Sequence, residues 1–161
     1  MTLSSLQIGL DIDLRTPAEI NNTTVPPDPM NGHDRVPEGA TWVNVNIFGT
    51  QPPAPVNNLL YQNFVTNAGE AAAFGTVLRD LANVSGPALY HCSAGKDRTG
   101  WTSMLLQTIA GVPSATIMRD YLASNNYIGQ VLDIGQPMVQ QQSLQVGSIK
   151  SRRRMGRCML I

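Results

Sequence analysis

Residues 88–100 read ALYHCSAGKDRTG, and this stretch decides which fold the sequence can adopt. Its first four residues are typical of a short buried strand, and a helix is predicted from Thr99 to Ala110, with Gly111 just past its end. A polar loop joins the two and enters the helix at its N-terminus. Such a loop turns successive backbone N–H groups toward one point, at the positive end of the helix dipole, so it predicts an anion site.

Cys92 and Arg98 stand six positions apart in this loop, which puts a thiol and a guanidinium around one bound anion. Arg98 can bind two phosphate oxygens with its planar fork, and Lys96 adds positive charge at the rim. The field of the loop favours a thiolate over a thiol, which would make Cys92 a nucleophile. The alternative is that Cys92 is a small buried apolar residue, as most free cysteines are.

The other residues of the loop are expected to support this chemistry. Gly95 permits a backbone conformation closed to other residues and a close approach to the ligand. The hydroxyl of Thr99 can donate a hydrogen bond to the thiolate, and His91 is expected to hydrogen-bond the backbone behind the loop. The predicted phosphate-binding residues are Ser93, Ala94, Gly95, Lys96, Asp97 and Arg98.

The segment HCSAGKDRTG at residues 91–100 resembles the signature loop of the protein tyrosine phosphatase superfamily. More narrowly, GKDRTG is similar to the loop of the atypical tyrosine and lipid phosphatases of bacteria, the mycobacterial tyrosine phosphatase B type. Two further segments resemble that group: DIDLRTPAEI at residues 11–20 and DYLASN at residues 120–125. The resemblance implies an α/β fold, with a cysteine-phosphatase-like central sheet flanked by helices.

The same resemblance implies hydrolysis of phosphate monoesters through a phosphocysteine intermediate, with no metal or other cofactor. The expected substrate is a phosphorylated protein, phosphotyrosine first, with dual specificity toward phosphoserine and phosphothreonine or activity on a phosphoinositide as extensions. Lys96 is associated in that group with breadth toward inositol phosphates. A phosphate-binding pseudoenzyme or an inactive fragment is the alternative function, and sulfur transfer or arsenate reduction fits the loop less well.

The leaving oxygen of a phosphate ester needs a proton, and an aspartic acid is the usual donor. Asp97, inside the loop, is the best candidate by position, and its alternative role is to orient Arg98 or a loop N–H group. Asp28 and Asp34, in the loop before the second predicted strand, are the other candidates. The predicted catalytic residues are therefore Cys92, Arg98 and Asp97.

Outside the loop, alternation of apolar and polar residues predicts strands, each with one buried face, at residues 8–14 and 41–48. Thr16 and Glu19 predict a capping box that opens a short helix. Arg15 is expected to pair with an acid such as Glu19, while Trp42 and Trp101 are expected to pack. Further helices are predicted at residues 57–66, 67–81 and 113–124, so strands and helices alternate as in α/β folds.

Length and composition fit one domain, since the chain has 161 residues, 42% of them hydrophobic and 14% charged. The formal net charge of 0 gives no general attraction to nucleic acid. We interpret residues 1–150 as a phosphatase domain, whose two ends depart from the family pattern as a truncated domain would, and residues 151–161 as a basic tail. The two cysteines, Cys92 and Cys158, exclude a disulfide framework, and no zinc-ligand spacing occurs.

The compartment is left open by the sequence. No stretch is as long and apolar as a membrane span, and the first ten residues lack the features of a signal peptide. The pattern is compatible with a cytoplasmic protein and with a secreted protein whose chain is longer. No feature predicts an oligomeric state.

Overall fold

The structure is a computed structural model, and it describes residues 3–51, 56–128 and 159–160. Its centre is a sheet in the order β2-β1-β3-β4, in which β1, β2 and β3 are parallel and β4 is antiparallel to β3. The strands are β1 (Leu10–Asp13), β2 (Thr41–Asn44), β3 (Ala88–His91) and β4 (Met159–Leu160). The helices are η1 (Leu3–Leu6), α1 (Pro17–Ile20), α2 (Asn58–Thr66), α3 (Ala68–Asn83), α4 (Asp97–Ile109), α5 (Ser114–Ala123) and α6 (Asn125–Ile128).

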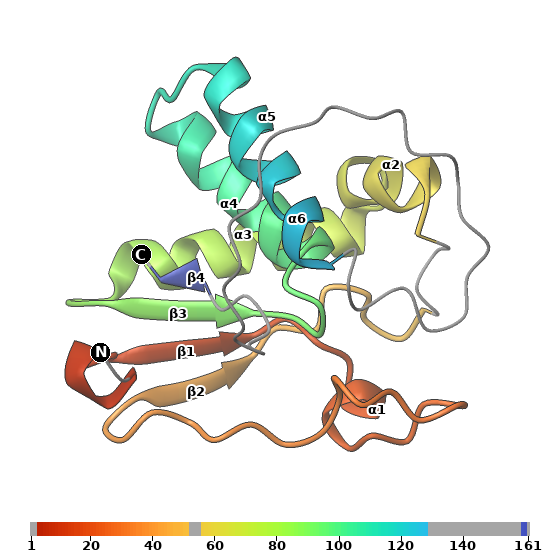
Figure 1. The fold of residues 1–161 in the computed structure, drawn as a ribbon, viewed down its shortest axis with the longest axis vertical. Coiled ribbons are helices and arrows are strands. Elements are labelled where there is room, and N and C mark those ends of the chain that lie inside the picture. The colour runs from red at the N-terminus through yellow and green to blue at the C-terminus, as the bar shows by residue number, and fades with distance from the viewer. Residues whose placement is uncertain (1–2, 52–55, 129–158, 161) are drawn as a thin grey trace.

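The carboxyl ends of the three parallel strands meet at one edge of the sheet. Asp13, the last residue of β1, is in register with Asn44 of β2 and His91 of β3. In Figure 1 the arrowheads of β1, β2 and β3 all point toward the side where α1 lies. The segment after each strand therefore starts at this edge, including the loop of residues 92–96 that leads into α4.

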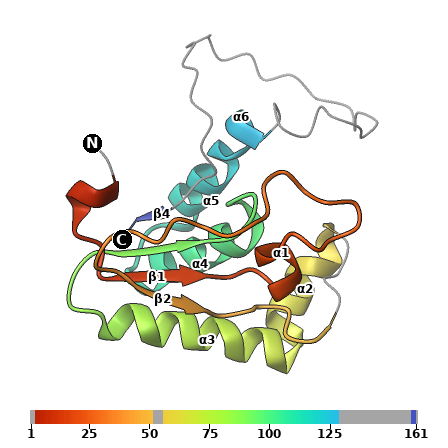
Figure 2. The ribbon, with the colours of Figure 1, turned by 90° about the horizontal axis from the view of Figure 1, so that it is seen from below.

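The helices cover the sheet and leave a contiguous apolar core. Figure 2 shows α3 running alongside the strands, and α3 contributes Phe74 and Val77 to a cluster that includes Ile12 of β1 and Tyr90 of β3. Phe64 of α2 packs edge-to-face on Phe74, with 5.0 Å between the ring centroids. Among the described helices, none is long and apolar enough to cross a membrane.

Strand β1 differs from its prediction, because all four of its residues are buried rather than every second one. It lies between β2 and β3, and its polar residues are covered as well: Asp11 is 1% and Asp13 0% exposed. Asp13 is ion-paired to Arg15. A buried central strand with polar residues at its end indicates a site at that edge rather than a solvent-exposed face.

Predicted boundaries also move, and β1 spans Leu10–Asp13 rather than residues 8–14. The strand expected at residues 41–48 ends at Asn44, whose side-chain amide donates to the carbonyls of Asp13 and Arg15, and the chain then turns around Asn46. Helix α4 begins at residue 97, two residues before its predicted start, since Gly100 N–H already donates to the Lys96 carbonyl. The remaining helices and the capping box of α1 are confirmed. Of the predicted basic tail, only residues 159–160 lie in the described part, where they form β4, and Cys158 lies outside it.

Candidate active site

The loop between β3 and α4 forms the floor of the candidate site. Gly95 has φ 69°, in the left-handed region that favours glycine, and this lets the chain turn inward before α4 starts. The first backbone N–H groups of α4 have no intrahelical acceptor, as at every helix N-terminus. The N-terminus of α4 therefore lies at the carboxyl edge of the sheet, and the anion site that the sequence predicts there stays a prediction.

Cys92 comes directly after β3 and is 8% exposed. Thr99, in the first turn of α4, is 1% exposed and donates from Oγ1 to Cys92 Sγ over 3.2 Å. This is the contact expected from the sequence, and it is worth more to a charged thiolate than to a neutral thiol. Cys92 is thus a thiol beside a hydrogen-bond donor, at the start of the loop that leads into α4.

Arg98 is held at the opposite side of the loop by Glu19 of α1. Its Nη1 and Nη2 donate to Glu19 Oε2 over 2.8 Å and to Glu19 Oε1 over 2.6 Å, and Nη1 also donates to the Leu14 carbonyl over 3.2 Å. The guanidinium lies 4.9 Å from the centroid of the Phe48 ring. A side chain that is 9% exposed and held on three sides has little freedom left, so its orientation is set before any ligand binds.

Glu19 is the site residue that sequence reasoning missed. Burial opposes its ionisation, but the hydrogen bonds and charge of Arg98, with further bonds from Thr16 N–H and Ser93 Oγ, hold its pKa at about 2. Glu19 therefore has two roles: it is the N3 residue of the capping box that starts α1, and it is the partner of Arg98. No local sequence pattern marks this role: Glu19 and Arg98 meet because α1 follows β1, β1 neighbours β3, and the parallel strands end at one edge of the sheet.

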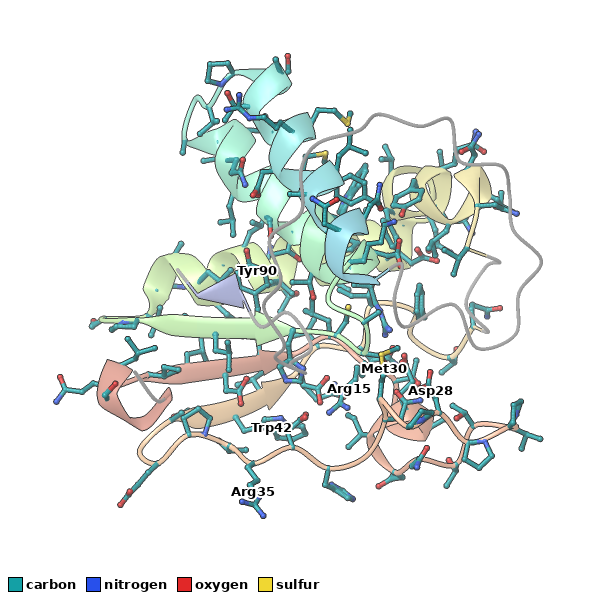
Figure 3. All side chains as sticks on the ribbon, in the orientation of Figure 1. Arg15, Asp28, Met30, Arg35, Trp42 and Tyr90 are labelled. Atoms are coloured by element: carbon teal, nitrogen blue, oxygen red, sulfur yellow. The ribbon has the colours of Figure 1, made fainter. Side chains whose placement is uncertain are left out.

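Arg15 has other partners than the Glu19 expected from the sequence. Its guanidinium is ion-paired to Asp13, at 2.8 Å, and to Asp34, and it donates to the Gly32 carbonyl over 3.0 Å. Glu19 is unavailable because it is already bound to Arg98. Figure 3 shows Arg15 at the carboxyl edge of the sheet, on the side where the labelled Asp28 and Met30 of the following loop lie. Arg15 thus fastens that loop to β1, a structural role.

His91, at the end of β3, lies beside the carboxylates of Asp11 and Asp34. Its Nε2 lies 3.6 Å from Asp11 Oδ1 and 3.5 Å from Asp34 Oδ2, longer than hydrogen bonds. Burial is the main reason why the pKa of Asp11 is raised. Among the described residues Asp13, Asp34 and His91 could offer metal ligands within 4.8 Å of one another. Arg15 already supplies a positive charge to both carboxylates, so we assign the cluster a structural role, and the absence of a metal stays a prediction.

Asp97, the first residue of α4, is half-buried and accepts a hydrogen bond at Oδ1 from the Tyr61 hydroxyl of α2. The other two candidates for the acid have structural partners: Asp34 is ion-paired to Arg15, and Asp28 Oδ1 accepts from Met30 N–H over 2.8 Å in a turn. Asp97, in the first turn of α4 and next to Arg98 in the chain, stays the candidate for the acid.

Two further contacts tie the loop to its surroundings. Lys96 Nζ donates to Asn125 Oδ1 over 2.6 Å, which gives the DYLASN segment a place beside the loop. Ser93 Oγ donates to Glu19 Oε1 over 2.7 Å and lies 2.9 Å from Asn31 Oδ1, so the loop of residues 21–40 touches the site. Trp101 is half-buried against the ring of Phe64, as expected for a packing residue, whereas Trp42 is 42% exposed.

The chain is similar to known phosphatases. The model of the family described as "Tyrosine phosphatase family" matches residues 1–156. The chain is 34% identical over 142 residues to a tyrosine-protein phosphatase of Nostoc commune, a match that covers 81% of this chain and 45% of the relative. It is 38% identical over 82 residues to the triple specificity protein phosphatase PtpB of Mycobacterium tuberculosis, covering 51% of this chain and 29% of the relative. The matches thus span less than half the length of either relative.

Proposed function

The chain belongs to the tyrosine phosphatase family, and on this premise we propose that it hydrolyses phosphate monoesters through a cysteinyl-phosphate intermediate. The observation that carries the proposal is the way Glu19 binds Arg98. A guanidinium has five N–H donors, and three of them are used by Glu19 and the Leu14 carbonyl. The remaining two, on Nε and Nη2, share one edge of the guanidinium, the geometry that grips two oxygens of a phosphate.

The reaction then runs in two steps. Cys92 Sγ attacks phosphorus in line, an S–P bond forms and the P–O bond to the leaving group breaks, while Asp97 gives its proton to the leaving oxygen. Water next attacks the phosphocysteine, Asp97 takes a proton from that water, and the S–P bond breaks to restore the thiolate. Arg98 and the loop N–H groups stabilise the charge on the equatorial oxygens in both steps, usually the largest contribution to such catalysis.

The substrate we propose first is phosphotyrosine in a protein. Family membership favours it, and the name of the mycobacterial relative, a triple specificity phosphatase, supports testing phosphoserine and phosphothreonine as well. The positive charge of Lys96, whose Nζ donates to Asn125 Oδ1, supports testing a substrate with a second negative charge, such as a phosphoinositide.

The decisive experiment measures phosphate release by the purified chain from a phosphotyrosine peptide, from phosphoserine and phosphothreonine peptides, and from a phosphoinositide panel. Cys92→Ser should release no phosphate, while Cys158→Ser, the matched control, should behave as the wild type. Phosphate trapped on Cys92 in acid-quenched reactions, read by mass spectrometry, would support the intermediate. Binding of inorganic phosphate without any turnover would instead favour a phosphate-binding pseudoenzyme.

A separate experiment tests the acid. Asp97→Asn should slow the hydrolysis of aryl phosphates with poor leaving groups by about 10²- to 10⁴-fold and that of good leaving groups far less, because a good leaving group departs without a proton. Asp28→Asn and Asp34→Asn are the controls and should keep the wild-type dependence on leaving group. An equal loss for all leaving groups in Asp97→Asn would mean that Asp97 only orients the loop.

A further inference from the structure

Asp97 is connected to two tyrosines that come from two other helices. Tyr61 of α2 donates its hydroxyl to Asp97 Oδ1, and the hydroxyl of Tyr121 of α5 lies 2.6 Å from that of Tyr61. Neither tyrosine belongs to the phosphate-binding loop. The three side chains form a chain of hydrogen bonds that starts in α5, passes through α2 and ends on a carboxylate in the first turn of α4.

The direction of these bonds follows from the number of protons. An ionised carboxylate only accepts, so the single hydroxyl proton of Tyr61 points to Asp97, and Tyr121 must then donate to Tyr61. Burial, with further contributions from Asp97 and Tyr121, raises the pKa of Tyr61, so Tyr61 keeps its proton at neutral pH. The charged neighbours of Asp97 along the chain are Lys96 and Arg98.

Packing holds both tyrosines in place. The Tyr61 ring makes edge contacts with the rings of Phe64, at 5.8 Å, and Tyr121, at 6.5 Å between centroids. Tyr121 reaches its position because residue 100 is a glycine: a Cβ there would lie 3.0 Å from the Tyr121 ring. The hydroxyl of Tyr61 is therefore fixed relative to α4, and it can fix the rotamer of Asp97 in turn.

We propose that Tyr61 is a positioning residue for the proton transfer, holding Asp97 Oδ1 so that Oδ2 carries the proton toward the leaving oxygen. The inference rests on the proposed function. As the P–O bond breaks, the proton leaves Oδ2 and Asp97 becomes a carboxylate, and the bond from Tyr61 strengthens because its acceptor gains charge. An interaction that strengthens along the reaction lowers the barrier rather than only aiding binding. In the second step the same bond keeps the carboxylate aimed at the attacking water.

The test is Tyr61→Phe, assayed with a series of aryl phosphates whose leaving groups range from good to poor. We expect kcat for the poorest leaving group to fall by about ten- to a hundredfold, the value of one hydrogen bond to a charged group, with KM nearly unchanged. For the best leaving group kcat should stay close to that of the wild type. Tyr121→Phe should also lower kcat for poor leaving groups more than for good ones, but by a smaller factor. This second variant decides the test if Tyr61→Phe folds poorly.

Tyr90→Phe is the matched control. It also removes a hydroxyl beside α4, one that lies 2.9 Å from Ser103 Oγ, yet its hydrogen bond lies away from Asp97. It should leave the dependence on leaving group unchanged. The double variant Tyr61→Phe/Asp97→Asn should match Asp97→Asn alone, because Tyr61 acts through Asp97. Equal loss for all leaving groups in Tyr61→Phe, or multiplied losses in the double variant, would overturn the proposal.

A second readout needs no turnover. The ¹³C resonance of the Asp97 carboxyl, identified by its absence in Asp97→Asn, should shift at constant pH in Tyr61→Phe and stay in place in Tyr90→Phe. A resonance that does not move in Tyr61→Phe overturns the positioning role whatever the kinetics show. If the resonance shifts in Tyr61→Phe but the wild-type chain hydrolyses no phosphate ester, the proposed function is refuted instead, so the two failures are distinguishable.

Discussion

Replacing Glu19 by glutamine removes the charge that holds Arg98 and should destabilise the protein at neutral pH. The pKa of Glu19 is about 2 against an ordinary value of 4.5, and each pH unit of that difference is worth about 1.4 kcal/mol. The ionised carboxylate therefore contributes roughly 3 kcal/mol to folding, of the order found when one partner of a buried ion pair is removed. Glu19 is 16% exposed in its side chain, so solvent screens little of this.

The sign of the pH dependence follows from the lowered pKa. A carboxyl group whose pKa is lowered by folding stabilises the protein fully above its unfolded value, near 4.5, and loses that contribution as the pH falls toward 2. The wild type should thus lose its advantage over Glu19→Gln between about pH 4.5 and pH 2. At pH 7 the full difference should be present.

Urea denaturation at a series of pH values measures both effects, with the midpoint and the slope fitted together. Glu38→Gln, in an exposed loop position, is the control and should change stability by less than about 0.5 kcal/mol. The reasoning is refuted if Glu19→Gln is as stable as the wild type at pH 7, or if the gap between them stays constant as the pH is lowered. The variant should also bind inorganic phosphate more weakly, since Arg98 is no longer oriented.

Three further results are expected. Thr99→Val removes the hydrogen bond to Cys92 Sγ and should slow alkylation of Cys92 by iodoacetamide at neutral pH by about tenfold. The control, Thr108→Val on the exposed end of α4, should leave the alkylation rate unchanged. Equal rates in the two variants would show that Thr99 does not stabilise the thiolate. Turnover should survive EDTA, and loss of activity that a divalent ion restores would contradict the absence of a metal. Gly100→Ala should lower the melting temperature, because its Cβ would press on the Tyr121 ring; an unchanged melting temperature would mean that α5 moves away freely.

The sequence was sufficient for the parts of the site that lie close together in the chain. The strand at residues 88–91, the turn at Gly95 and the helix after it are written in consecutive residues, so local patterns predict them. The capping box of α1 was predictable for the same reason, since Thr16 and Glu19 are three positions apart.

The contacts that cross the sheet could not be predicted in this way. Glu19 and Arg98 are 79 positions apart, and Tyr61 and Asp97 are 36 apart. Such pairs depend on which strands are neighbours and which loop closes over them. Arg15 shows the difficulty, because Glu19 is four residues away and a plausible partner by distance along the chain, yet Asp13 and Asp34 take that place.

Glu19 of α1 holds Arg98 of α4, so the affinity for phosphate should depend on whether the first twenty residues are in place. Fraying of α1 alone, residues Pro17–Ile20, would withdraw Glu19 from Arg98 while β1 stays between β2 and β3 and the core around it stays packed. Phosphate affinity should then fall before the far-ultraviolet circular dichroism of the helices does. Loss of function would thereby precede loss of fold, which makes phosphate binding the more sensitive assay for damage near the N-terminus.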